Sequence, residues 1–146
     1  MSGRPVRVAI TETGSGFGGT ARYLADLVAH LDRTRFAPHI LAAENGPLVA
    51  ALRASGVPVT CRRWWRFPSP AADRTGGRPV DYAWFALLGA PHALAVIASA
   101  WWWLRRRRIE VFHANNEILS CLPMLIAARL AGCRTLCHLH GWRPLS

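Results

Sequence analysis

The chain contains no lysine. All 18 of its basic residues are arginine, against only eight acidic residues, and its net charge is +10. A basic balance of this size indicates an anionic partner. Because the sequence is also rich in Ala, Gly and Pro, part of the charge follows from a compositional bias. The distribution is more informative, since residues 1–60 carry six arginines against four acids and residues 61–146 carry twelve against four.

Cysteine is also scarce, with four residues: Cys61, Cys121, Cys133 and Cys137. Nothing at the amino terminus resembles a secretory signal, because the first residues lead directly into a strand-like run. We therefore expect reduced thiols in a cytoplasmic protein and no disulfide framework. Cys133 and Cys137 lie close to His138 and His140, but this spacing is not that of a closed zinc site, and we expect no metal.

The chain shows no short internal repeat, and strand-like runs alternate with helical ones along it. The expected strands cover residues 6–11, 36–43, 57–61, 109–113 and 134–140. The expected helices cover residues 20–31, 48–54, 81–108 (one helix, or two broken near 89–91) and 117–131, with an exposed loop at 62–80. This alternation predicts one α/β domain over residues 1–146, a Rossmann-like, doubly wound parallel sheet whose ligands bind at the carboxyl ends of its strands.

A glycine-rich segment, residues 14–19 (GSGFGG), separates the first expected strand from a helix that Thr20 is suited to cap. The segment fits G-x-G-x-x-G, which brings a phosphate close to a helix amino terminus. A dinucleotide site would need an acid about 20 residues further on, but Glu44 lies 25 residues after Gly19. We therefore favour a phosphate or sugar contact, with a standalone dinucleotide-binding module and a purely structural turn as alternatives.

Three blocks of sequence resemble glycosyltransferase family 4. The first is the strand and glycine-rich segment from Thr11 to Leu31, with Gly18, Gly19 and Arg22 in the matching places. The second is residues 109–116 (IEVFHANN), and the third is residues 135–141 (TLCHLHG), which resembles a strand end of the form V-x-x-x-H-G. Their order and spacing agree with the family across nearly the whole chain.

This resemblance implies a B-type glycosyltransferase built from two Rossmann-like domains. The amino-terminal domain binds the acceptor, and the carboxy-terminal domain binds a nucleotide-sugar through an E-x7-E motif, with retention and usually without a metal. No such motif occurs here, so the resemblance implies a truncated acceptor-side domain that is inactive alone. The whole enzyme would be of the hexosyltransferase type, use no cofactor and transfer a sugar to a glycan or lipid-linked acceptor in cell-envelope or polysaccharide synthesis.

The resemblance also assigns site residues. It makes His140 a catalytic residue beside the transferred sugar, where a neutral imidazole could support developing charge. The residues that it places at the donor phosphate or substrate are Gly16, Gly18, Gly19 and Arg22, and those that it places at the acceptor are His113, Asn115 and Asn116. From the residues themselves, His140 could instead be a core histidine, and the two asparagines could cap the next helix.

The most conspicuous segment is residues 101–108 (WWWLRRRR), which closes an uncharged run from Tyr82 to Leu104. The run is long enough to cross a bilayer, but Pro91 and His92 near its centre and the flanking strands argue against that. We expect a buried crossover helix, a peripheral contact with an anionic membrane on its inner face, or both. The candidate contact residues are Trp64, Trp65, Trp101, Arg105 and Arg106. A non-catalytic membrane-docking domain is an alternative function, and without a recognisable module we expect no nucleic-acid partner.

Overall fold

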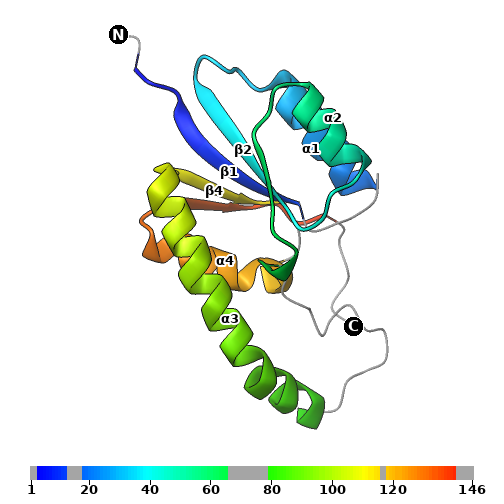
Figure 1. Ribbon diagram of the computed structural model, residues 1–146, viewed down its shortest axis with the longest axis vertical. Coiled ribbons are helices and arrows are strands. Elements are labelled where there is room, and N and C mark those ends of the chain that lie inside the picture. Colours follow the sequence, from blue (N-terminus) through cyan, green and yellow to red (C-terminus); the bar gives the residue numbers. More distant parts are fainter. Residues whose placement is uncertain (1–2, 13–17, 66–78, 116–117, 141–146) are drawn as a thin grey trace.

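The computed structural model describes residues 3–12, 18–65, 79–115 and 118–140, without the side chains of residues 64, 79–86, 88 and 119. In this part of the chain, five strands form one parallel sheet in the order β3-β2-β1-β4-β5 (Figure 1). The strands are β1 (Val6–Glu12), β2 (Phe36–Ala42), β3 (Val59–Cys61), β4 (Val111–Ala114) and β5 (Arg134–Cys137). The predicted α/β, Rossmann-like fold class is confirmed.

Helices cover both faces of the sheet. In the described part of the chain they are α1 (Gly19–His30), α2 (Pro47–Ala54), α3 (Pro79–Arg107) and α4 (Ile118–Leu130), with a short 3₁₀ helix, η1 (Arg63–Trp65). One core cluster joins α1 and α2 to the sheet, and a second joins α3 and α4 to it. Figure 1 shows the same division, with α1 and α2 together at one side and α3 and α4 at the other.

The central strand β1 supplies both cores. Successive side chains of a strand point to opposite faces, so Val8 and Ile10 pack under α1 and α2, whereas Ala9 packs under α3 and α4. A strand that is covered on both faces needs consecutive apolar residues rather than an alternating pattern. The run Val8-Ala9-Ile10 has this composition, which is why the sequence alone placed a strand here.

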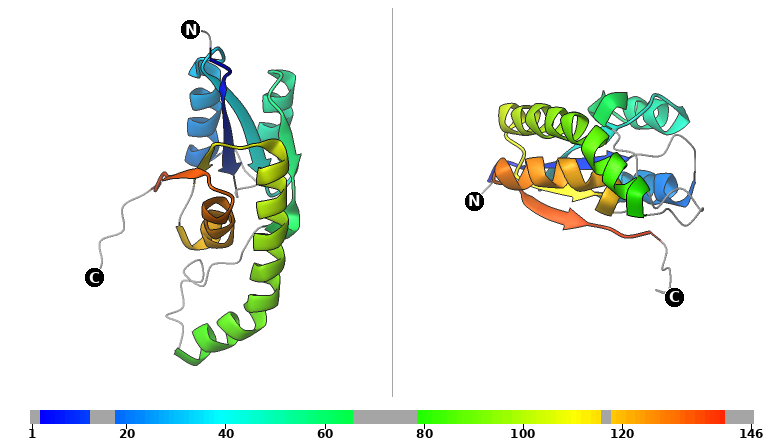
Figure 2. Two further views of the ribbon diagram at one scale, coloured as in Figure 1. Left: turned by 90° about the vertical axis from the view of Figure 1, so that its left-hand side faces the viewer. Right: turned by 90° about the horizontal axis from the view of Figure 1, so that it is seen from below.

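Helix α3 is one continuous helix of 29 residues, so the break considered near residues 89–91 does not occur. Proline removes one backbone donor and pushes against the preceding turn, which bends a helix rather than ending it when solvent can reach the freed carbonyl. Pro91 and Leu87, one turn earlier, are both exposed. The helix bends in its amino-terminal part, as the left view of Figure 2 shows.

Two predicted boundaries are wrong. Helix α1 begins at Gly19 with Gly18 in the cap position, so Thr20 lies inside the helix and is not its cap. Strand β5 ends at Cys137, three residues before the predicted end at His140. The register explains this, because Cys137 pairs with Ala114, the last residue of β4, and a longer β5 would have no neighbouring strand.

The loop predicted for residues 62–80 holds the short helix η1, which sends Trp65 into the core. Trp65 is only 4% exposed, its indole N–H donates to Ser99 Oγ at 3.0 Å, and its ring meets Trp103 edge-on at 6.0 Å. Trp65 therefore offers no surface to a membrane, which corrects its assignment as a contact residue. The side chain of Trp64 lies outside the described residues.

The uncharged run of residues 82–104 lies within α3, which connects β3 to β4 of the same sheet. No helix in the described part of the chain is long and apolar enough to cross a bilayer. Helix α3 instead buries Val96, Ala100, Trp103 and Leu104 in the core with α4. It is thus a crossover helix with one buried face.

Two leucines of α3 provide a direct test of this packing. Leu104 is 1% exposed and Leu94 is 66% exposed. Leu104→Ala should lower the free energy of unfolding by about 2–5 kcal/mol, because it opens a cavity in the core. The same change at Leu94 should stay within about 0.5 kcal/mol. Urea unfolding followed by circular dichroism measures both, and equal losses would contradict the orientation of α3.

Candidate functional site

The strand order creates one place where a ligand of this fold is expected to bind. The chain leaves the central strand β1 on one side toward β2 and β3, and later builds β4 and β5 on its other side. In doubly wound sheets, ligands bind outside the carboxyl ends of the strands at this reversal. Of the six buried polar or charged residues in the described part of the chain, four lie there: Thr11, Glu12, His113 and Asn115.

Asn115 connects three elements at this reversal. Its side chain is 0% exposed, and its Nδ2 donates to Glu12 Oε2 at 3.3 Å and to the carbonyl oxygen of Thr20 at 3.4 Å. Its backbone N–H donates to Thr11 Oγ1 at 3.3 Å. A carboxylate and a carbonyl can only accept hydrogen bonds, so the amide nitrogen must face Glu12 and Thr20. Asn115 thus lies beneath the site, and the expected direct contact with an acceptor does not suit a side chain without exposed surface.

The amide orientation of Asn115 also sets the tautomer of His140. The Oδ1 atom of Asn115 lies 2.9 Å from His140 Nε2. Because Oδ1 can only accept, Nε2 carries the hydrogen and donates it. A neutral His140 therefore keeps Nδ1 as a hydrogen-bond acceptor. The buried asparagine holds a partly exposed imidazole in one tautomer at the strand ends.

Three histidine rings follow one another from this point. The ring of His140 lies 4.2 Å from that of His138, which stacks on His113 at 6.3 Å. Tyr23 of α1 meets His138 edge-on at 4.4 Å and His140 at 5.2 Å. The rings thus tie the segment after β5 to β4 and α1. In the described part of the chain, no group of three His, Cys, Asp or Glu side chains is arranged to hold a metal ion.

Burial and neighbouring charge lower the pKa of two of these histidines, His113 and His140. Burial is the largest cause that lowers the pKa of His113, followed by the charges of His138 and His140. Burial and then His138 likewise lower the pKa of His140. Each imidazole is disfavoured in its charged form when its neighbour is protonated. At neutral pH His113 and His140 can therefore accept and donate hydrogen bonds without adding positive charge.

His113 has an unsatisfied polar atom. Its Nε2 is the one buried side-chain polar atom without a hydrogen-bond partner in the described part of the chain. Leaving such an atom unpaired costs about 1–3 kcal/mol. His113 lies in β4, whose end borders the reversal, and is buried there. A water molecule enclosed at the strand ends would satisfy this nitrogen, whereas a ligand would not reach it directly, because the atom is buried.

The amino terminus of α1 borders the same region. Gly18 and Gly19 are exposed, and a Cβ added to either would meet nothing within 4 Å. Gly18 also has an ordinary extended backbone. Neither packing nor backbone strain therefore demands glycine here, which leaves room for a ligand near the free N–H groups of the first turn. Arg22 is exposed one turn further along, while Gly16 and Asn116 lie outside the described residues.

A hollow of about 320 Å³ opens beyond the carboxyl ends of β2 and β3. Its lining residues include Glu44, Asn45, Cys61 and Arg63. The thiol of Cys61 donates to Asn45 Oδ1 at 3.2 Å, which fixes part of this wall. The hollow offers both donors and acceptors, as the hydroxyl groups of a sugar require.

The sequence analysis missed Glu12 and Tyr23. Glu12 is 2% exposed at the end of β1, and its position directly after an apolar strand and before the glycine-rich segment was a usable signal. Tyr23 carries no comparable signal, because its role depends on the contact of α1 with the segment after β5. The sequence analysis considered His138 only for a zinc site, yet this residue links the other two rings.

The coupling within this row can be measured. His138→Gln should raise the pKa of both His140 and His113, because it removes a positive charge that disfavours their protonation. Imidazole resonances followed by NMR over a pH titration report both values. His30→Gln, an exposed change on α1, should leave them unchanged. A pKa of His140 that does not move in His138→Gln would contradict the close approach of the two rings.

Comparison with known proteins agrees with this geometry. A family profile described as glycosyl transferase 4-like domain matches residues 18–146. No curated protein sequence matches the chain. The match begins at the amino terminus of α1 and includes His113 in β4, Asn115 directly after β4, and His140 after β5.

Several solved structures are similar in fold. MurG from Acinetobacter baumannii is 18% identical with a TM-score of 0.61, covering 94% of this chain and 37% of that chain. HepE from Anabaena, in complex with UDP and glucose, is 17% identical with a TM-score of 0.55, covering 93% of this chain and 30% of that chain. WaaB, a lipopolysaccharide outer core galactosyltransferase, is 12% identical with a TM-score of 0.53, covering 92% of this chain and 32% of that chain.

The chain thus spans about a third of the length of these three structures. Their identities are low, so the likeness concerns the fold alone. The family profile covers far more than half of the chain, and its match confirms the resemblance found in the three sequence blocks. The chain therefore belongs to the glycosyl transferase 4-like domain family.

Proposed function

We propose that this chain is the acceptor-side domain of a retaining glycosyltransferase of the hexosyltransferase type. It would transfer a sugar from a nucleotide-sugar to a glycan or lipid-linked acceptor. A second domain, outside this chain, would bind the donor, and this chain alone would not complete the transfer. The observation that best supports the proposal is the network of Glu12, Asn115 and His140 at the strand-order reversal, where this fold binds its ligands.

In this proposal His140 acts on the sugar being transferred. Its Nε2–H is engaged with Asn115, so Nδ1 remains to accept a hydrogen bond from a sugar hydroxyl. A neutral ring suits a reaction in which positive charge develops on the sugar, because a charged imidazolium would oppose it. Asn115 is a positioning residue, since it acts through His140. Its own hydrogen bonds are made within the protein.

Acceptor and donor would approach from different elements. The hollow beside Glu44 and Arg63 supplies polar groups for acceptor hydroxyls. The exposed amino terminus of α1 at Gly18 and Gly19 supplies backbone N–H groups for a donor phosphate. Both features border the carboxyl ends of the strands, which is consistent with one reaction cleft.

Two of the similar structures support the substrate classes. HepE was solved with UDP and glucose, which supports a nucleotide-sugar as donor. WaaB is a lipopolysaccharide outer core galactosyltransferase, which supports a role in cell-envelope or polysaccharide synthesis. Both are distant in sequence, so they indicate the class of donor and acceptor and leave the particular sugar open.

We also propose that the exposed side of α3 contacts the inner face of an anionic membrane. Leu87, Leu94 and Trp101 are exposed and spaced seven residues apart, which places them on one helix face. Arg105 follows Trp101 by one turn, and Arg106 stacks over the neighbouring exposed indole ring. Tryptophan favours the bilayer interface and arginine attracts anionic headgroups. Such a surface would bring the domain to a lipid-linked acceptor.

The role of His140 is tested in the whole enzyme, with its donor domain. His140→Ala should lower kcat by about 10- to 100-fold, because it removes a group held against the reacting sugar. Leu139→Ala is the matched control, since Leu139 is the exposed neighbour and should retain full turnover. Product release measured with a panel of nucleotide-sugars reports both variants, and NMR of the product tests retention. Unchanged turnover in His140→Ala would remove His140 from the site.

The membrane contact has its own matched pair of variants. Trp101→Ser should weaken co-sedimentation with phosphatidylglycerol vesicles by about fivefold or more, because it removes an indole from the contact face. Leu130→Ser changes an apolar residue at the end of α4 that is more exposed than Trp101, and it should leave vesicle binding unchanged. Equal binding of Trp101→Ser and the unmodified protein would reject this surface.

A further inference from the structure

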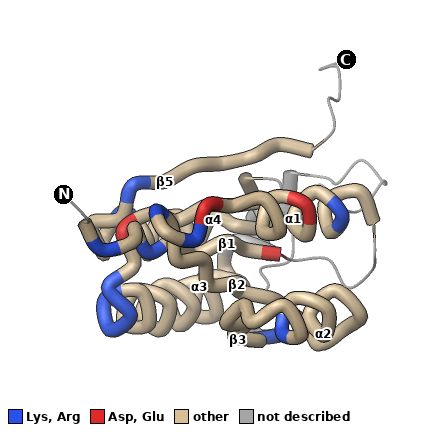
Figure 3. Tube along the Cα trace, turned by 90° about the horizontal axis from the view of Figure 1, so that it is seen from above, with Lys and Arg blue, Asp and Glu red and all other residues tan. Residues whose placement is uncertain are grey.

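The arginines gather at the edge of the sheet opposite the proposed cleft. Figure 3 shows them around the start of β1, the end of α3 and the start of β5. The chain enters its strands at this edge, so residues far apart in sequence meet there. In the described part of the chain they are Arg4, Arg7, Arg33, Arg35, Arg105, Arg106, Arg107, Arg108 and Arg134. Residues 1–60 and residues 61–146 therefore both contribute arginines to this positively charged edge.

One pocket of about 350 Å³ opens within this edge, between the start of β1, the start of β2 and the end of α3. Its polar lining consists of Arg7, Arg106, Arg107 and His39, and the remaining wall is formed by an alanine, two prolines and an isoleucine. No carboxylate is among the described lining residues. Three guanidinium groups that share a pocket without an acid repel one another, and a bound anion turns that repulsion into attraction.

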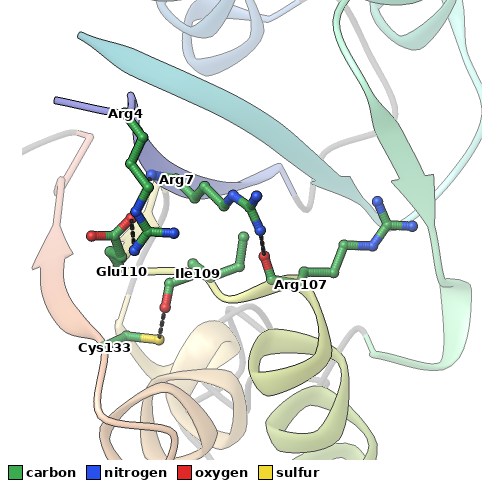
Figure 4. A network of polar contacts seen from close by, with 6 residues as sticks. All are labelled: Arg4, Arg7, Arg107, Ile109, Glu110 and Cys133. Atoms are coloured by element: carbon green, nitrogen blue, oxygen red, sulfur yellow. Dashed lines mark hydrogen bonds and ion pairs between the residues drawn. The ribbon is translucent and has the colours of Figure 1, made fainter. Parts of the chain in front are cut away.

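The nearest carboxylate is already engaged. Glu110 accepts the backbone N–H of Arg7 at 3.3 Å and forms an ion pair with Arg4 at 3.6 Å (Figure 4). Figure 4 also shows Arg7 donating to the backbone carbonyl of Arg107 at 3.0 Å. That bond uses one of the five N–H donors of the Arg7 guanidinium. Among the described residues, the carbonyl of Arg107 is the one acceptor with which the Arg7 side chain forms a hydrogen bond.

The pocket arginines are held in place by neighbours that do not neutralise them. Arg107 lies over the ring of Trp103 at 5.3 Å, and its Nη1 donates to His39 Nδ1 at 3.4 Å. His39 in turn donates from Nε2 to Thr60 Oγ1 at 2.7 Å. Burial and the charge of Arg107 lower the pKa of His39 to about 4, so the ring stays neutral at physiological pH. Arg106 is supported by Trp102, 5.1 Å below it.

We propose that this pocket binds a phosphate group, as a phosphate monoester or a diphosphate, through Arg7, Arg106 and Arg107. Guanidinium groups offer paired N–H donors that match phosphate oxygens. The apolar wall suits the carbon skeleton that carries the phosphate. The volume suits a small headgroup or metabolite.

The site is separate from the proposed cleft. Arg7 is the second residue of β1 and Glu12 is its last, so the two ends of the strand lie about 16 Å apart at 3.3 Å per residue. A phosphate in this pocket cannot be the one that leaves during sugar transfer. The inference therefore stands on the geometry of the amino edge and does not depend on the proposed function.

The experiment titrates the full chain with inorganic pyrophosphate by isothermal titration calorimetry. Arg106→Gln and Arg107→Gln should each weaken the Kd by about tenfold, because each removes a charged paired donor. Arg108→Gln removes the same charge from the residue next to Arg107, but Arg108 is exposed and does not line the pocket, and the Kd of this variant should stay within about twofold. Circular dichroism checks that each variant is folded. If Arg107→Gln unfolds because it loses its contacts with Trp103 and His39, Arg106→Gln tests the pocket instead.

Two arms then identify the source of the phosphate. Displacement of pyrophosphate by vesicles of phosphatidic acid, but not by phosphatidylserine vesicles of matched charge, indicates that the pocket binds a lipid headgroup. Failure of both vesicle types to compete indicates a soluble phosphate compound, and either result supports the pocket. Equal weakening in Arg108→Gln and Arg107→Gln overturns the proposal, because it shows attraction to a diffuse positive field. Absence of pyrophosphate binding overturns it as well.

Discussion

The hydrogen bond between the buried side chains of Asn115 and Glu12 is the constraint on which the carboxyl edge of the sheet depends. A carboxylate without solvent needs donors close by, and an amide that gives its nitrogen to Glu12 and Thr20 has only its oxygen left for His140. The side chain of Asn115 therefore forms hydrogen bonds with β1, with α1 and with the segment after β5. Loss of the Asn115 side chain would remove one donor from Glu12 and the hydrogen-bond partner of His140. The same substitution would therefore lower the stability of the domain and release the imidazole of His140 from its position.

A parallel sheet has two unequal edges, and this chain uses them differently. The carboxyl edge holds neutral histidines and a buried acid, whereas the amino edge holds a concentration of arginine. Charges at the amino edge are screened from the cleft, since the length of β1 exceeds the screening length of about 8 Å at physiological salt. An anion held by Arg7 and Arg107 would therefore not compete electrostatically with a sugar held near His140.

The parts that were predictable from sequence are those that local pattern determines. The apolar run of β1, the proline at the start of α2 and the glycines that end α2 and α4, with φ of 72° and 82°, follow from backbone and burial rules. The three adjacent tryptophans show the limit, since only Trp103 is buried while Trp101 and Trp102 are exposed. Which of the three tryptophans is buried depends on the face that α3 turns toward α4, and the sequence alone does not determine that face. Tyr23 and the pocket at Arg7 were likewise invisible, because each joins residues that only the fold brings together.

The pairing of β1 with β4 has a consequence for how the domain forms. The bonds that join the two strands connect residues about a hundred positions apart, as in the contact of Glu12 with Asn115. Long-range pairings of this kind form late, because the intervening chain must first lose its freedom. During synthesis the first three strands and α1 can assemble before β4 has emerged from the ribosome. The imidazole of His140 reaches its position only when β4 and the segment after β5 are in place, so an ordered His140 reports completion of the five-stranded sheet.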